Sequence, residues 1–170
     1  MKIDIARQPL VPAFMTLFAL AVAAMCAGIP VSDTSGAVRD ALPLLGGQLA
    51  RFQAAYPVWS KFAAGFMLLF TGMCAGRITI RYNLYTVGTC LPIPLYAIVA
   101  CGIATGGNYL AGFAASMLLA LATKNYCRAF CNGYGFDAIF RASLYLGLMP
   151  LVYAPGLPML LLSLIHISEP

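Results

Sequence analysis

Four charged residues in the second half of the chain are the best candidates for contacting a ligand. Lys124 and Arg128 are four residues apart, and so are Asp137 and Arg141; residues at this spacing share one face of a helix. Basic residues at the end of an apolar segment attract anionic lipid headgroups. We therefore predict that these four residues contact a lipid headgroup or a substrate that carries phosphate.

Six cysteines offer a second kind of chemistry. Four of them are expected on one side of the molecule: Cys74, Cys90, Cys127 and Cys131. Four thiolates can bind zinc, but the close pair at 127 and 131 has no matching second pair, and packing as small apolar residues is the favoured interpretation. A disulfide between Cys26 and Cys101 is an alternative in an oxidising compartment. We predict no metal and no cofactor.

The last nine residues, 162–170, do not resemble the rest of the chain. They have the sequence LSLIHISEP and look like a translated sequencing-library adaptor, so the native sequence is expected to continue differently after Leu161. This tail contains the only histidine, His166, and the only glutamate, Glu169. Without them the chain offers no histidine base and no nucleophile–base pair, and we predict that it has no catalytic residue and is not an enzyme.

The composition of the 170 residues points to a membrane environment. Hydrophobic residues make up 62%, charged residues only 9%, and the mean hydropathy is +0.87, whereas soluble domains carry about 25% charged residues. This excludes a disordered chain and a disulfide-rich secreted scaffold. The net charge of +5 is scattered along the chain, which excludes a nucleic-acid partner and leaves the lipid bilayer and other membrane subunits.

Five apolar segments approach the roughly 20 residues that a membrane-spanning helix needs. They cover residues 11–29, 58–76, 86–104, 109–123 and 142–161. Their runs are continuous rather than alternating, which favours helices over a barrel. We predict an all-α, polytopic transmembrane helical bundle with about five spans, forming a single domain over residues 1–161 and truncated at its C-terminus.

Two of these segments leave alternatives open. The first segment is favoured as an uncleaved signal anchor over a cleaved signal peptide, because it is longer than a typical signal sequence. In the third, Pro92 and Pro94 mark either a broken helix, as in transporters, or simply the first turn of a helix that starts late. The fifth has similar prolines, at positions 150, 155 and 158.

Lysine and arginine are unevenly distributed between the two sides of such a bundle. Seven fall on the side of the N-terminus: Lys2, Arg7, Arg77, Arg81, Lys124, Arg128 and Arg141. Three fall on the other side: Arg39, Arg51 and Lys61. Positively charged residues favour the cytoplasmic side, so the N-terminus is predicted in the cytoplasm. The outer loop contains an amphipathic segment, residues 37–56, expected to lie on the outer membrane surface, or alternatively to form a lid over a pocket.

The second half of the chain also carries a family resemblance. An apolar span ending in Lys124-Asn125-Tyr126, the group Phe136-Asp137-Ala138, and the run 151–155 (LVYAP) occur in this order. Between Lys61 and Pro155 the chain resembles an uncharacterised family of multi-pass bacterial inner-membrane proteins, a domain of unknown function. The resemblance implies location in the bacterial inner (plasma) membrane. We expect a non-enzymatic accessory or structural component of envelope assembly or transport; a transporter or lipid-handling protein is the alternative.

Overall fold

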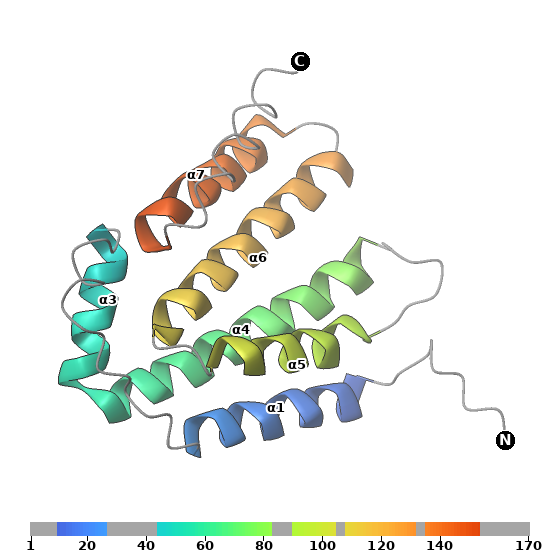
Figure 1. The fold of residues 1–170 in the computed structure, drawn as a ribbon. Coiled ribbons are helices and arrows are strands. Elements are labelled where there is room, and N and C mark those ends of the chain that lie inside the picture. Colours follow the sequence, from blue (N-terminus) through green and yellow to red (C-terminus); the bar gives the residue numbers. More distant parts are fainter. Residues whose placement is uncertain (1–9, 27–43, 83–89, 105–107, 132–134, 154–170) are drawn as a thin grey trace, which may run out of the picture.

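The chain folds into α-helices wherever its structure is described. The computed structural model describes residues 10–26, 44–82, 90–104, 108–131 and 135–153, and this part contains no strand. Its six helices are α1 (Leu10–Cys26), α3 (Leu44–Ala55), α4 (Pro57–Arg81), α5 (Pro92–Ala104), α6 (Tyr109–Cys131) and α7 (Phe136–Val152) (Figure 1). The prediction of an all-α fold is confirmed.

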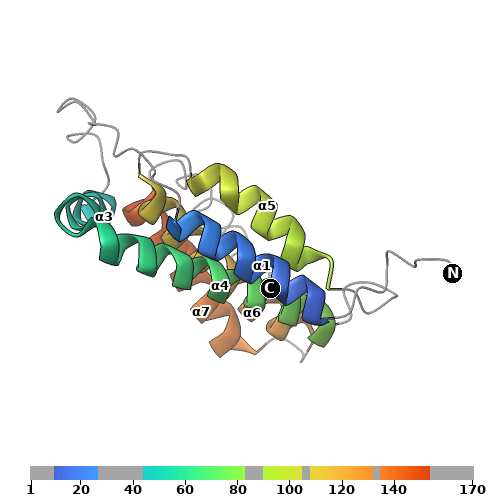
Figure 2. The same ribbon diagram turned by 90° about the horizontal axis from the view of Figure 1, so that it is seen from below.

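Five of the helices alternate in direction along the chain. Figure 1 shows α1, α5 and α7 running opposite to α4 and α6. The C-terminal ends of α4 and α6 therefore lie at the same end of the bundle as the N-terminal ends of α1, α5 and α7. Helix α4 packs against α1, α3, α5 and α6, and α7 packs mainly against α6. In Figure 2, α1, α4 and α5 lie beside one another, with α3 at the far end of α4.

Two glycines let neighbouring helices approach α4 closely. A Cβ atom at Gly72 would lie 2.7 Å from Leu17 Cδ2 of α1, and one at Gly76 would lie 2.5 Å from Ile93 Cδ1 of α5. Both large side chains are almost completely buried. Because the two glycines are four residues apart, they lie on one side of α4. Small residues on this side therefore allow α1 and α5 to pack closely against α4.

The predicted number of membrane spans is not confirmed. Among the described residues, one helix, α4, is long and apolar enough to cross a membrane; the apolar stretch of α1, Ala13–Ala23, is shorter. At about 1.5 Å per residue, the 25 residues of α4 extend about 37 Å, more than the roughly 30 Å of a bilayer core. Helix α6 continues to Cys131, past the predicted limit of 123, and α7 begins at Phe136, before the predicted start at 142.

The proline-rich start of the third segment is a helix start and not a break. Helix α5 begins at Pro92, so Pro92 and Pro94 both lie in its first turn, where a missing backbone N–H costs nothing. The late start leaves α5 with 13 residues, fewer than the predicted segment. In α7, Pro150 lies inside the helix near its C-terminal end, and residues 155 and 158 lie outside the described part.

The amphipathic segment is helical from Leu44 to Ala55, while residues 37–43 lie outside the described part. Its apolar residues Leu45 and Phe52 are exposed. Gln53 is a polar residue off the apolar face of this segment, yet it is only 4% exposed. Its Oε1 atom accepts a hydrogen bond from the backbone N–H of Leu110 at 3.5 Å. This N–H belongs to the first turn of α6 and has no partner within its helix, which explains the burial of the amide.

Candidate functional site at the basic end

Most described cations gather at one end of the bundle, which we call the basic end. It contains the C-terminal turns of α4 and α6 and the N-terminal turns of α7, with these charged residues: Arg77, Arg81, Lys124, Arg128, Asp137 and Arg141. The opposite end has Arg51 of α3 and Lys61 in the second turn of α4. Alternating helix directions produce this clustering (Figure 1). The cations lie in the C-terminal turns of α4 and α6 and in the N-terminal turns of α7, and these turns are at the same end of the bundle.

A pocket of about 760 Å³ opens at the basic end. Helix α4 forms most of its wall, and α5 and α6 contribute one residue each. Its lining is Phe70, Met73, Cys74, Arg77, Ile78, Ile80, Arg81, Tyr82, Ile93 and Lys124. We call it the basic pocket. It combines apolar walls with three cations, and none of its described lining residues is acidic. This arrangement suits a ligand with an anionic group and an apolar part.

The four predicted contact residues separate into two groups. Lys124 lines the basic pocket, whereas Arg128, one turn further along α6, does not. Asp137 and Arg141, which the sequence places on one helix face, form an ion pair with 3.1 Å between Arg141 Nε and Asp137 Oδ1. Both side chains of this pair are more than half exposed, so their attraction is largely screened by water. Headgroup contact by these residues remains a prediction.

Sequence analysis did not include Arg77 and Arg81 among the site residues. Both were assigned to the cytoplasmic side, but as orientation signals only. Their spacing of four residues at the end of an apolar segment is the same signal that singled out Lys124 and Arg128. The sequence does not show which helices pack together. Lys124 lines the same pocket as Arg77 and Arg81 because α4 packs against α6.

Four cysteines can be placed, and each is a free thiol. Cys74 lines the basic pocket, Cys90 is buried, and Cys131 is exposed. Burial raises the pKa of Cys127, and the neighbouring Cys131 thiol raises this pKa further. Within the described ranges no three His, Cys, Asp or Glu residues gather into a metal site, which contradicts the four-thiolate alternative. The side chains of Cys26 and Cys101 lie outside the described part.

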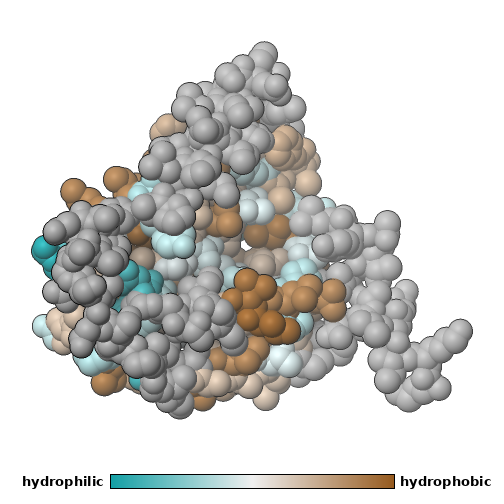
Figure 3. All heavy atoms as spheres, viewed as in Figure 1, coloured by the Kyte–Doolittle hydropathy of each residue, from teal (hydrophilic) through white to brown (hydrophobic). Residues whose placement is uncertain are grey.

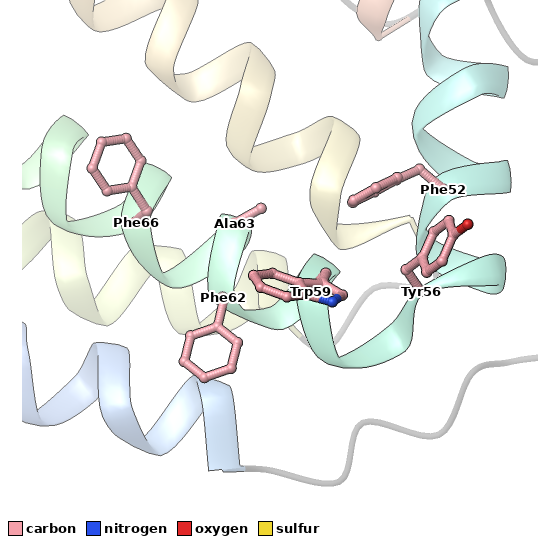
Figure 4. Close-up of a pocket in the computed structure, with 6 residues that line it drawn as sticks. All are labelled: Phe52, Tyr56, Trp59, Phe62, Ala63 and Phe66. Carbon is pink, nitrogen blue, oxygen red and sulfur yellow. The ribbon is translucent and has the colours of Figure 1, made fainter.

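A second surface feature lies at the other end of α4, and we call it the aromatic surface. A shallow hollow of about 540 Å³ is lined by Phe52, Tyr56, Trp59, Phe62, Ala63 and Phe66 (Figure 4). These residues come from the last turn of α3, the junction, and the first turns of α4. Phe52 and Tyr56 have ring centroids 5.6 Å apart, and Trp59 and Phe62 6.4 Å apart. Among the described residues its lining has no charged side chain, so it offers apolar and ring contacts and the polar groups of Tyr56 and Trp59.

Exposed apolar side chains continue beyond this surface. On α4 they recur at steps of three and four residues, which is one helical face: Trp59, Phe62, Phe66, Phe70 and Met73. On α5, Leu95, Ile98 and Val99 are more than half exposed, and Figure 3 shows a hydrophobic area over this helix. Soluble monomers rarely expose contiguous apolar patches of this kind.

Comparisons with models of protein families, with curated proteins and with solved structures find no match. The resemblance between Lys61 and Pro155 to an uncharacterised membrane family therefore stays a prediction.

Proposed function

We propose that this chain is a multi-pass integral membrane protein that acts as a non-enzymatic accessory or structural component of envelope assembly or transport. The observation that carries the proposal is the exposed apolar face of α4. It runs from Trp59 to Met73, and the single charged residue in this stretch, Lys61, lies off this face of the helix. In water this face would be unfavourable, but against lipid tails it is the expected surface of a bundle.

The opposite face of α4 supports the same proposal. It contains small residues, among them Ser60, Ala64, Gly72 and Gly76, all buried. Small residues facing neighbouring helices and large residues facing outward are typical of packing in membranes, where lipid offers no hydrophobic drive for helix association. The alternating directions of α1, α4, α5, α6 and α7 (Figure 1) also match those of consecutive membrane spans.

The proposed orientation places the basic end in the cytoplasm of a bacterial cell, at the inner membrane. Arg77, Arg81, Lys124 and Arg128 then lie where the positive-inside rule favours them. The aromatic surface, which includes Trp59 and Tyr56, lies at the opposite membrane–water interface, where amphipathic rings are enriched. The charges thus support one direction of insertion, and the rings are compatible with it.

A lipid-handling role is the second candidate, and the basic pocket is the observation that favours it. Three cations above apolar walls can hold the headgroup of a lipid while its chains contact protein. The proline-broken third span that the transport alternative invoked is not available, because α5 begins at Pro92.

The first proposal is tested by fractionating cells that express the full chain. Washing the membranes with alkaline carbonate strips peripheral proteins and leaves integral ones in the pellet. We expect the chain in the pellet, with release by detergent only. Recovery as a monodisperse species in aqueous extract without detergent would contradict the proposal.

A further inference from the structure

We propose that the basic pocket binds an acyl lipid whose phosphate headgroup carries two negative charges. This inference rests on the proposed membrane location. The charges of the pocket alone indicate an anionic ligand, and the inference specifies that this anion is a lipid headgroup. Phosphate chemistry could come from a lipid headgroup or from free phosphate, and the apolar walls favour the lipid.

The size and walls of the pocket fit part of an amphiphile. Its volume of about 760 Å³ lies within the range of small-molecule sites, about 300–1,000 Å³. Phe70 and Met73 of α4 are partly exposed and supply apolar contacts on the side of the pocket towards the middle of the helix. Free phosphate makes no use of these walls, whereas the acyl chain of a bound lipid would lie against them.

The charges of the pocket call for more than one negative charge on the ligand. Arg77 and Arg81 lie one turn apart on α4, and Lys124 reaches the same pocket from α6. None of the three forms an ion pair with a described residue. Arginine can bind phosphate through two parallel N–H bonds and lysine as a compact point charge. A singly charged headgroup would leave two of the three cations uncompensated.

Helix dipoles account for only part of this arrangement. The C-terminus of a helix favours a cation in its last turn, and Arg81 of α4 and Arg128 of α6 are in that position. Arg77 and Lys124 lie before the last turn of their helices, where this effect has faded. Their presence in one pocket is explained by a shared anion.

The position of the pocket agrees with a lipid ligand. It lies at the basic end, which the proposed orientation puts at the cytoplasmic leaflet. Anionic lipids are enriched in that leaflet, and basic pockets between membrane helices on this side bind multiply charged headgroups. Tyr82, next to the end of α4, lines the same pocket and can donate its hydroxyl proton to a phosphate oxygen.

The test uses the purified full chain in detergent and measures bound lipid by native mass spectrometry. The probes are phosphatidic acid, which has a phosphomonoester headgroup, phosphatidylglycerol, which carries one charge, and inorganic phosphate as competitor. We expect retention of phosphatidic acid over phosphatidylglycerol, with no displacement by inorganic phosphate at equal concentration. Displacement at equal concentration would assign the pocket to free phosphate and overturn the lipid assignment.

Matched variants connect the binding to the pocket. Arg77→Gln, Arg81→Gln and Lys124→Gln should each weaken phosphatidic acid binding roughly fivefold, and the triple variant on the order of a hundredfold. Arg51→Gln is the control, because it removes an exposed cation of α3 at the opposite end of the bundle that does not line the pocket. Equal losses in the control and in the pocket variants would show nonspecific attraction and overturn the inference.

A steric variant keeps the test independent of charge. Met73 is 41% exposed and lines the pocket, so Met73→Trp should fill it and reduce binding of phosphatidic acid while all cations remain. Undiminished binding in this variant and in the triple variant would overturn the inference. If the chain stays in carbonate-washed membranes but binding is undiminished in both variants, only this inference is contradicted. If carbonate releases the chain, the proposed function is contradicted.

Discussion

The two ends of α4 differ in almost every property that matters for contact with a membrane. At the start of the helix, the aromatic surface exposes Trp59, Phe62 and Phe66 and has no charge in its lining. At its end, the basic pocket has similar apolar walls but adds Arg77 and Arg81. One helix therefore carries rings at one end and cations at the other. In the proposed membrane location, the cations at one end would set the direction of the molecule relative to the bilayer.

The difference also concerns what each end can bind. The aromatic surface offers ring faces and no ionic contact, so it suits the disordered interface of a membrane. The basic pocket draws its lining from three helices and can distinguish ligands by charge. We infer that the first end seats the protein and the second end recognises a ligand.

The largest effect is expected for a charge placed in the middle of the apolar face. Phe66 is 67% exposed and lies near the centre of α4, so Phe66→Arg should cost about 3 kcal/mol of membrane insertion. Protease protection or carbonate extraction measures the inserted fraction. Phe136→Arg, at the first residue of α7 on the basic end, is the control and should insert normally. Equal insertion of both variants would contradict a lipid-facing α4.

A smaller loss is expected where α5 approaches α4 beside the basic pocket. Gly76→Ala would bring a Cβ within 2.5 Å of Ile93 Cδ1, and the buried side chain must shift. Overpacking of this kind costs about 1–3 kcal/mol. Thermal unfolding in detergent measures the effect. Gly147→Ala is the control, because nothing lies within 4 Å of its added atom; it should stabilise α7 by about 0.5–1 kcal/mol. Equal changes would show that the close contact is unimportant.

At the aromatic end, a buried hydrogen bond joins α4 to α6. Ser60 donates its single hydroxyl proton to the Pro57 carbonyl at 2.8 Å, so Tyr109 donates in the 2.6 Å contact between the two hydroxyls. Tyr109→Phe should lower the free energy of unfolding by about 1 kcal/mol. Tyr153→Phe is the control, because Tyr153 is a partly exposed residue after α7. It should change the free energy of unfolding by less than about 0.5 kcal/mol. Thermal unfolding compares the two; an unchanged Tyr109 variant would show that the bond contributes nothing.

The smallest effect is expected for the ion pair at the start of α7. Asp137→Asn removes the partner of Arg141, but both side chains are largely exposed, so the stability change should stay below about 0.5 kcal/mol. The same variant should leave binding in the basic pocket unchanged, since neither residue lines it. A large loss of either property would mean that the basic end works as one charged network.

Local features of the fold could be predicted from the sequence. The all-helical class follows from continuous apolar runs, and the late start of α5 at Pro92 matches one of the two interpretations that its prolines left open. The pairing of Asp137 with Arg141 follows from helical spacing. These predictions succeed because they depend on residues within one or two turns of each other.

Features that depend on distant residues could not be predicted. Gln53 is assigned to the polar side by its type, and only the position of the first turn of α6 explains why it is buried. Arg77 and Arg81 join Lys124 because α4 and α6 run in the same direction (Figure 1). Hydrophobic periodicity describes each helix but contains no information about its neighbours.

The central claim, a bundle crossing the membrane with its basic end in the cytoplasm, is tested most directly by labelling single cysteines with a membrane-impermeant maleimide. Cys131 is exposed at the basic end, and Gln48 is exposed on α3 at the other end. One variant keeps only Cys131; the other has Gln48→Cys as its single cysteine. In intact bacterial cells we expect labelling at position 48, and at position 131 only after permeabilisation. Labelling of Cys131 in intact cells, with position 48 protected, would contradict the account.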